Sequence, residues 1–316
     1  MQKRTLGKSG LEVAPLAFGG NVFGWTIDQN TSFQLLDAFT DAGFNLIDTA
    51  DGYSVWVPGH TGGESETIIG NWLKSRGNRD KVVIATKVGW EIAPDKKGLK
   101  KSYIFERVEE SLRRLQTDYI DLYQSHVDDA STPFEETLEA YDQLIKAGKV
   151  RAIGASNIKA DRLQQALETS KQHHLPIYQS LQPEYNLYSR QEFEEALEPL
   201  CLQEGIGVIS YYALASGFLT GKYRSESDLN KSPRGGGVKR FLNERGFSIL
   251  SALDEVAARH NANPAQISLA WLMARPSITA PIASATSLEQ LNDLTKAAQI
   301  TLSQEDIALL DKASAY

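Results

Sequence analysis

Residues 44–53 read FNLIDTADGY, and this stretch combines a strand signal with the first candidate catalytic residues. The short apolar run that follows Gly43 is typical of a buried strand. It ends at Asp48, and Tyr53 follows five residues later in an expected loop. A carboxylate at the end of a buried strand is costly unless it is paired, and a phenol donates a proton more readily if a cation lowers its pKa from about 10. The stretch therefore predicts a site that needs a cation from elsewhere in the chain.

The rest of the chain repeats this strand signal, with helical patterns between the repeats. The expected strands are residues 15–18, 44–48, 81–87, 118–126, 150–155, 177–181, 207–211 and 279–283. Among the expected helices, residues 102–116 place four apolar side chains on one face. Eight strands that alternate with helices predict an α/β fold of the (β/α)8 TIM barrel type, and a doubly wound parallel sheet is the structural alternative.

Two segments stand outside this repeat. Residues 5–13 predict a short N-terminal β-hairpin with Gly7 and Gly10 in its turn. Residues 215–245, after the seventh expected strand, are rich in Gly and Ser and too long for a bare connection, so they predict a functional loop. Because no hydrophilic linker divides the chain, we expect residues 1–316 to form a single barrel domain.

Composition excludes several classes of function. With 41% hydrophobic and 23% charged residues among 316, the chain is typical of globular proteins, and its net charge of −7 argues against a nucleic-acid partner. A lone cysteine, Cys201, excludes a disulfide framework and a thiolate metal cluster. No apolar run approaches the roughly 18 residues of a membrane span, and the N-terminus lacks a signal-peptide core. We therefore expect a cytoplasmic protein without a membrane partner.

Polar residues gather at the C-terminal ends of the expected strands, where barrels place their chemistry. These ends supply Asp48, Lys87, His126, Ser156, Asn157, Gln179 and Tyr211. Each has a structural explanation by itself, such as an ion pair between Asp48 and Lys87. Together with Tyr53, these residues indicate an enzyme that transfers a proton to a carbonyl group while that group is being reduced. Lys87 would favour the phenolate of Tyr53, Asp48 would hold Lys87, and His126 would donate a hydrogen bond to the carbonyl oxygen. The reductant must be a bound cofactor.

Four motifs resemble the aldo-keto reductase superfamily, and the resemblance covers essentially the whole chain. Residues 48–53 are similar to the family's D-T-A-x-x-Y, residues 84–87 to its lysine strand, residues 118–126 to its histidine strand and residues 151–157 to its G-x-S-N motif. The occurrence of all four motifs in this order is highly specific for the family. The resemblance implies a catalytic tetrad of Asp48, Tyr53, Lys87 and His126, in which Tyr53 is the general acid for reduction.

The same resemblance implies a nicotinamide cofactor and most of its contacts. Ser156, Asn157 and Gln179 would hold the carboxamide, and Tyr211 would stack on the ring. Residues 215–222 look like the loop that folds over the pyrophosphate, where small residues permit close approach of the backbone. Contributors from this region would be Leu214, Ser216, Gly217, Leu219 and Lys222. The segment is not a P-loop, because a serine stands at the required first glycine.

The choice between NADP(H) and NAD(H) depends on residues 283–290. Relatives that prefer NADP commonly place an arginine or lysine there for the 2′-phosphate, whereas this chain offers Ser284, Thr286, Ser287 and Gln290. Hydroxyl groups and the helix expected to begin at Ser287 can bind phosphate without an ion pair. Arg240, in the long loop beside Lys239, could supply the charge. We expect NADP(H), with NAD(H) as the alternative.

Three tryptophans are candidates for the wall of a substrate pocket: Trp25, Trp56 and Trp90 all lie in loops at the expected catalytic rim. They favour a small or medium aldehyde or ketone as substrate. A different class of function remains open, a cofactor-sensing accessory subunit resembling potassium-channel β subunits. A metal-dependent hydrolase would need a cluster of histidines and carboxylates, and no such cluster is expected among the five histidines.

Overall fold

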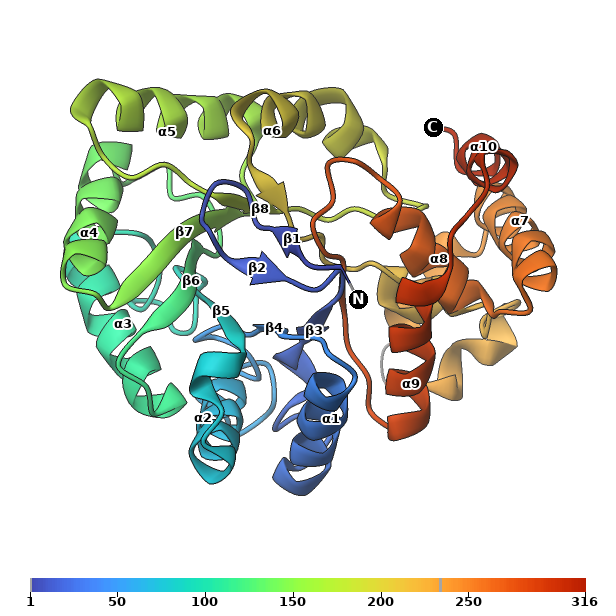
Figure 1. The fold of residues 1–316 in the computed structure, drawn as a ribbon, viewed down its shortest axis with the longest axis horizontal. Coiled ribbons are helices and arrows are strands. Elements are labelled where there is room, and N and C mark those ends of the chain that lie inside the picture. Colours follow the sequence, from blue (N-terminus) through green and yellow to red (C-terminus); the bar gives the residue numbers. More distant parts are fainter. Residues whose placement is uncertain (1, 233–234) are drawn as a thin grey trace.

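The computed structural model describes residues 2–232 and 235–316, and parallel strands curl into a barrel at its centre (Figure 1). The strands are β3 (Ala17–Gly19), β4 (Leu46–Asp48), β5 (Val83–Val88), β6 (Ile120–Ser125), β7 (Val150–Ser156), β8 (Ser180–Gln182), β9 (Gly207–Val208) and β10 (Ile282–Ala283). They are hydrogen-bonded in the order β10-β3-β4-β5-β6-β7-β8-β9. The N–H groups of Thr279 and Ile282 donate to the carbonyls of Val208 and Ser210, which joins the two ends of this order. The predicted (β/α)8 barrel is confirmed.

Helices cover the outside of the strands (Figure 1). They are α1 (Gln29–Asp41), α2 (Glu64–Arg76), α3 (Lys101–Leu115), α4 (Phe134–Lys146), α5 (Ala160–His173), α6 (Glu198–Glu204), α8 (Pro264–Met273) and α9 (Leu288–Lys296). Two more, α7 (Glu244–His260) and α10 (Gln304–Ala313), pack on each other at the right edge of the view. None of the helices in the described part of the chain is long and apolar enough to cross a membrane.

Sequence patterns explain which face of α3 is buried and why the chain widens before α6. Ile104, Val108, Leu112 and Leu115 of α3 are buried, as the spacing predicts. Before α6, the segment η3 (Phe193–Leu197) widens into a π-helical turn. Pro199, the second residue after it, has no N–H to continue the ordinary hydrogen-bond pattern, which accounts for the local change.

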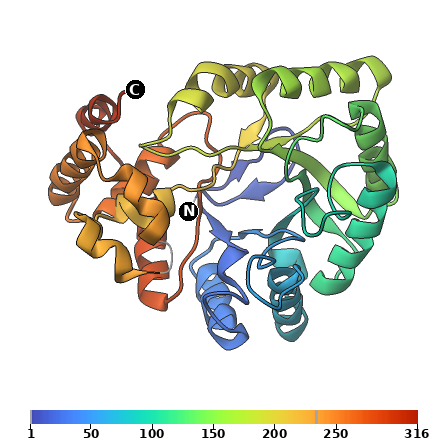
Figure 2. The same cartoon turned by 180° about the vertical axis from the view of Figure 1, so that it is seen from behind.

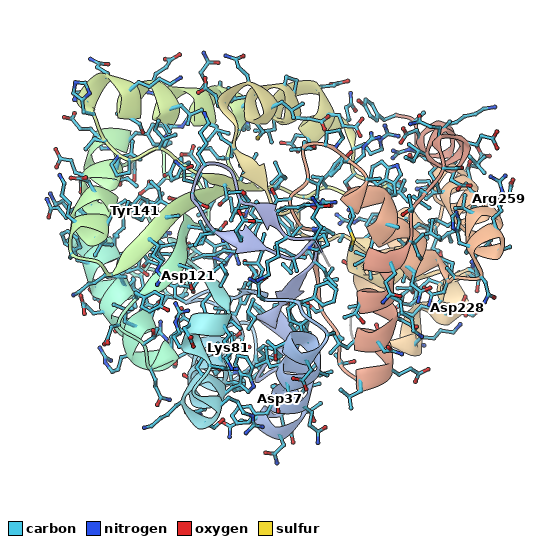
Figure 3. All side chains as sticks on the ribbon, in the orientation of Figure 1. Asp37, Lys81, Asp121, Tyr141, Asp228 and Arg259 are labelled. Atoms are coloured by element: carbon cyan, nitrogen blue, oxygen red, sulfur yellow. The ribbon has the colours of Figure 1, made fainter. Side chains whose placement is uncertain are left out.

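Polar residues also tie the outer layer to the strands. Asp121, labelled in Figure 3, lies near the start of β6 and is almost fully buried. Its carboxylate accepts hydrogen bonds from Arg79, from Arg151 and from the backbone N–H of Ile84 on β5. A buried carboxylate needs such partners, and here they fix the register of two neighbouring strands.

The predicted hairpin, β1 (Arg4–Thr5) with β2 (Glu12–Val13), closes one end of the barrel (Figure 1). Its side chains Leu6, Leu11 and Val13 join the apolar cluster inside the strands. Gly7 has a positive φ of 56°, and a Cβ there would lie 2.1 Å from the carbonyl oxygen of Gln179. Only glycine fits this close approach. The opposite end, which faces the viewer in Figure 2, is left for the loops that follow the strands.

The described residues of the long segment after β9 are folded into short helical turns. The segment contains η4 (Ala215–Thr220), η5 (Glu226–Lys231) and η6 (Gly235–Phe241), three short 3-10 segments. Phe218 and Phe241 are buried and stack with their ring centroids 5.3 Å apart. Both rings belong to the main hydrophobic core, so the segment is anchored to the barrel and can present backbone groups in a fixed arrangement.

Candidate active site

Lys87 lies at the centre of the site, near the C-terminal end of β5, and is fully buried. Its Nζ donates three hydrogen bonds: to Asp48 Oδ2 at 2.8 Å, to the carbonyl oxygen of Thr49 at 2.8 Å and to Tyr53 Oη at 2.7 Å. An ammonium group has three N–H donors, so all of them are used. The amine is therefore held in one position against the phenol.

Asp48 ends β4 and is equally well held. Its Oδ2 also accepts a hydrogen bond from Tyr53 Oη at 3.1 Å, and its Oδ1 accepts one from Gln182 Nε2 at 2.8 Å. The carboxylate thus pairs with Lys87 in a buried site, where it offsets the cost of burying the cation. Its position agrees with the expectation that Asp48 holds the lysine.

The pKa of the Tyr53 hydroxyl is raised well above its usual value, first by burial and then by the Asp48 carboxylate. The expectation that Lys87 would lower the pKa of Tyr53 is therefore wrong as a net effect in the resting protein, because burial and Asp48 act in the opposite direction. Burial also lowers the pKa of Lys87, and Asp48 opposes that change. Tyr53 is consequently a neutral phenol that carries a proton to donate.

His126 follows β6 directly, with its ring centroid 5.9 Å from that of Tyr53. Burial, together with the nearby charge of Lys87, lowers the pKa of the imidazole well below its usual value. The ring is therefore neutral and carries one N–H, which suits it to donate a single hydrogen bond. Its Nδ1 is buried, and no described residue hydrogen-bonds to it.

The sequence profile of the Aldo/keto reductase family matches residues 15–315 of this chain. The chain belongs to the aldo/keto reductase family. Members of this family are NAD(P)H-dependent oxidoreductases, and this chain is one of them.

Individual relatives agree with this assignment over most of their length. The uncharacterized oxidoreductase YrpG of Bacillus subtilis is 34% identical over 98% of this chain and 95% of its own. The aldo-keto reductase YhdN of the same organism is 34% identical, with 97% and 91% covered. A probable voltage-gated potassium channel subunit beta of Arabidopsis thaliana is also 34% identical, with 95% and 92% covered.

Beside the tetrad, this aldo/keto reductase brings together three of the residues expected to hold the nicotinamide. Tyr211 Oη donates to Asn157 Oδ1 at 2.8 Å, and Asn157 Nδ2 donates to the carbonyl oxygen of His126 at 2.9 Å. Ser156 lies next to them, and its hydroxyl donates to the carbonyl oxygen of Gln182 at 2.8 Å. An amide and a hydroxyl after β7 and an aromatic ring after β9 fit the carboxamide and ring of a nicotinamide.

Gln179 does not belong to this group, and that expectation is wrong. Its Oε1 accepts a hydrogen bond from the backbone N–H of Lys8 in the hairpin turn, at the closed end of the barrel. β8 begins only at Ser180, so Gln179 precedes the strand and Gln182 ends it. Gln182 is the glutamine at the catalytic end, where it binds Asp48. Pro183 cannot continue a strand ladder, so its position in the sequence could have marked the C-terminal end of β8.

The expected pyrophosphate loop has an unusual backbone. Ala215, Ser216 and Gly217 follow one another with positive φ values of 46°, 58° and 93°. The N–H groups of Ala215 and Gly217 donate to the carbonyl oxygens of Tyr212 and Leu214, so backbone hydrogen bonds hold these tight turns in place. Lys222 is exposed and its amine lies close to Gly217, since a Cβ on Gly217 would be 3.5 Å from its Nζ. This arrangement fits a diphosphate.

Leu214 and Leu219 contribute differently from the polar members of this loop. Leu219 is fully buried in the hydrophobic core, and its backbone N–H donates to the carbonyl oxygen of Leu214. Leu214 is half-buried and packs against the same core. Both side chains therefore shape the loop, and Leu219 has only backbone atoms to offer a ligand.

The residues expected at the adenosine end lie at the N-terminus of α9. Ser287 caps this helix by accepting a hydrogen bond from the N–H of Gln290, and Thr286 donates its hydroxyl to Gln290 Oε1 at 3.0 Å. Ser284 contacts the turn after β3, with Gly19 O at 2.7 Å and Asn21 Oδ1 at 2.8 Å from its hydroxyl. The helix N-terminus and its hydroxyls fit a phosphate group.

Arg240 is mostly exposed, and its guanidinium lies 3.9 Å from Glu184 Oε1, a loose ion pair. Neighbouring Lys239 pairs with Glu226 at 3.2 Å. Exposed pairs of this kind contribute little to stability, so the Arg240 guanidinium can exchange its partner for a ligand phosphate at small cost.

The three tryptophans lie around the tetrad. The ring centroid of Trp56 lies 6.1 Å from that of Tyr53 and 5.4 Å from that of Trp25. The ring centroid of Trp90 lies 5.1 Å from that of His126. Trp56 and Trp90 remain 48% and 45% exposed. Trp90 also lines a cleft of about 720 Å³ between the loops that follow β5 and β6. An apolar rim next to the phenol and imidazole suits an uncharged carbonyl substrate.

Sequence reasoning missed two residues near the site. Gln182 was missed because the strand was placed too early, and Asp51 was treated only as a loop position. Asp51 is fully buried and pairs with Arg107 at 2.9 Å. Among residues 2–232 and 235–316, no group of three or more histidine, cysteine or acidic side chains could hold a metal ion.

Proposed function

We propose that this aldo/keto reductase reduces the carbonyl group of a small or medium aldehyde or ketone, with NADPH as the hydride donor and Tyr53 as the proton donor. One observation carries the proposal: a neutral phenol is held between a buried ammonium and a buried carboxylate, 2.7 Å and 3.1 Å from its oxygen. This arrangement positions one proton and stabilises the anion that remains after transfer.

Each residue has a defined part in the reaction. A nicotinamide cofactor, when bound, would supply the hydride that the carbonyl carbon needs. Tyr53 gives its hydroxyl proton to the carbonyl oxygen, which completes the alcohol, and Lys87 stabilises the phenolate left behind. His126 donates a hydrogen bond that orients the carbonyl oxygen and favours the negative charge developing on it. Alcohol oxidation follows the same steps in reverse.

A screen of aldehydes and ketones with the purified protein tests this proposal. Oxidation of NADPH that depends on a carbonyl substrate and yields the alcohol is the expected result. If no aldehyde or ketone supports turnover with either nicotinamide, the reductase assignment is refuted. Benzaldehyde and acetaldehyde are useful first substrates because they differ in the area available for contact with the tryptophans.

The cofactor preference gives a separate prediction. We expect kcat/KM with NADPH to exceed that with NADH by about tenfold or more, since Arg240 and the N-terminus of α9 can both bind a 2′-phosphate. In the variant Arg240→Ala, KM for NADPH should rise about tenfold while KM for NADH changes little. Lys239→Ala is the matched control, because it removes a neighbouring positive charge from the same loop and leaves Arg240 in place. A tenfold preference for NADH in the unmodified protein overturns the choice of NADP(H).

The tryptophan rim predicts substrate selection by size. Trp56→Ala should lower kcat/KM for benzaldehyde by about tenfold and leave that for acetaldehyde within about twofold, because only the larger substrate loses apolar contact. Phe247→Ala on α7 serves as the control, since Phe247 is an exposed aromatic away from the rim. Equal losses for the two aldehydes would contradict a role of Trp56 in the pocket wall.

The similarity to a plant protein named as a potassium channel subunit beta supports a second candidate, a cofactor-sensing accessory subunit. Affinity capture with the purified chain, with and without NADPH, discriminates between the candidates. A partner retained in only one cofactor state supports the sensing role. Turnover without such a partner supports the reductase alone.

A further inference from the structure

A second group of buried charges lies next to Lys87 and takes no part in the reaction described above. Asp51, in the loop after β4, and Glu66, on α2, are fully buried carboxylates. Arg107 and Arg114, both on α3, are the cations that pair with them. Burying these charges costs desolvation free energy, so their position beside Lys87 indicates a role in the neighbouring site.

Asp51 connects this group to the tetrad. Its backbone N–H donates to the carbonyl oxygen of Lys87 at 3.2 Å, and its Oδ2 accepts a hydrogen bond from Arg107 Nε at 2.9 Å. Its Oδ1 is buried and accepts no hydrogen bond from a described residue. Arg107 is shared, because its Nη1 also pairs with Glu110. The negative charge of Asp51 is therefore only partly compensated.

Glu66 fixes the same group to the strand that carries the lysine. Its Oε1 accepts a hydrogen bond from the hydroxyl of Thr86 at 2.6 Å, and its Oε2 accepts one from Arg114 Nε at 2.7 Å. Thr86 immediately precedes Lys87 on β5. Two carboxylates besides Asp48 are thus anchored around the end of this strand.

The charges that surround Asp51 come from several elements. The charged and titratable groups are Asp48 of β4, Lys87 of β5, Tyr123 of β6, Glu66 of α2, Tyr141 of α4, and Tyr103, Arg107, Glu110 and Arg114 of α3. Burial lowers the pKa of Lys87; Asp48 and then Asp51 and Glu66 raise it. Asp51 and Glu66 therefore help Asp48 to keep a buried ammonium charged.

We propose that Asp51 is a positioning residue for the reaction: its carboxylate, held by Arg107, keeps Lys87 protonated, and its backbone N–H fixes the Tyr53-bearing turn to the end of β5. The kinetic part of this inference rests on the proposed reductase function. A direct measurement on the lysine does not depend on it.

The variant Asp51→Asn tests the proposal, because it keeps the shape of the side chain and removes its charge. Loss of a negative charge lowers the pKa of Lys87 and of the Tyr53 phenol alike. The alkaline limb of the kcat profile for carbonyl reduction should therefore move to lower pH by about one unit. A titration of the Lys87 side chain, followed by NMR of isotope-labelled lysine, should show a shift in the same direction, and the NADPH dissociation constant should stay within about twofold.

Glu110→Gln is the matched control, since Glu110 pairs with the same Arg107 but is partly exposed. Its alkaline limb and its Lys87 titration should coincide with those of the unmodified protein. Unchanged titration in Asp51→Asn, or an equal shift in Glu110→Gln, overturns the inference. If Asp51→Asn does not fold, Glu66→Gln must shift the Lys87 titration downward, and no shift there overturns it too. Absence of carbonyl turnover in the unmodified protein refutes the reductase function, while the NMR titration still decides this inference.

Discussion

Replacing Tyr53 by phenylalanine should lower kcat for carbonyl reduction by about a thousandfold or more. The substitution removes one oxygen atom, the hydroxyl that hydrogen-bonds to both Lys87 and Asp48 and carries the proton to be transferred. General acid catalysis contributes about 100- to 10,000-fold in enzymes, and here the same oxygen also receives the negative charge. The measurement is steady-state turnover of NADPH with an aldehyde that the unmodified protein reduces.

Cofactor binding separates loss of chemistry from loss of structure in this variant. By calorimetry, the NADPH dissociation constant of Tyr53→Phe should remain within about twofold of the unmodified value. Tyr212→Phe is the control, since Tyr212 is an exposed neighbouring phenol, and it should keep most of the turnover. Turnover of Tyr53→Phe at a rate close to that of the unmodified protein would remove Tyr53 from the mechanism.

Replacing Lys87 by methionine should affect both activity and stability. Without the ammonium, Asp48 remains buried with only Gln182 and Tyr53 as hydrogen-bond donors. Removing one partner of a buried ion pair costs about 3–5 kcal/mol of unfolding free energy, because the remaining charge is uncompensated. We also expect kcat to fall about a thousandfold, since the phenolate of Tyr53 loses its stabilising cation. Denaturant unfolding and steady-state kinetics measure the two effects.

The double variant Asp48→Asn/Lys87→Met distinguishes the two causes. Neutralising Asp48 removes the uncompensated charge, so much of the lost unfolding free energy should return. Activity should not return, because no cation faces Tyr53 in this protein. A double variant as unstable as Lys87→Met would show that packing of the lysine side chain, rather than charge, accounts for the loss.

The barrel and the tetrad were predictable because each depends on local sequence. The apolar run ending at Asp48 became β4, and the spacing of buried residues around Val108 became α3. Consecutive parallel strands bring their C-terminal ends to one rim, so Asp48, Lys87 and His126 had to be neighbours once the barrel was accepted. No pair of distant residues had to be guessed for this step.

What the sequence did not reveal depends on register and on burial. Gln179 and Gln182 are both glutamines beside one strand, and an error of a few residues in its start moved the prediction to the wrong end of the barrel. Asp51 and the Arg107 that pairs with it are 56 residues apart in the sequence, and no local pattern predicts this pair. The direction of the Tyr53 pKa likewise depends on burial, which only the packed structure supplies.

The distribution of indole rings gives this protein an intrinsic optical reporter. Trp72 and Trp271 are fully buried, and each donates its Nε1–H to an aspartate, so their emission should be blue-shifted and insensitive to ligands. Trp56 and Trp90 are half exposed beside Tyr53 and His126, and should emit at longer wavelength. A soluble quencher should therefore reach the second pair in preference to the two buried rings. Occupation of the site by a substrate should protect that pair, which makes binding visible without any label.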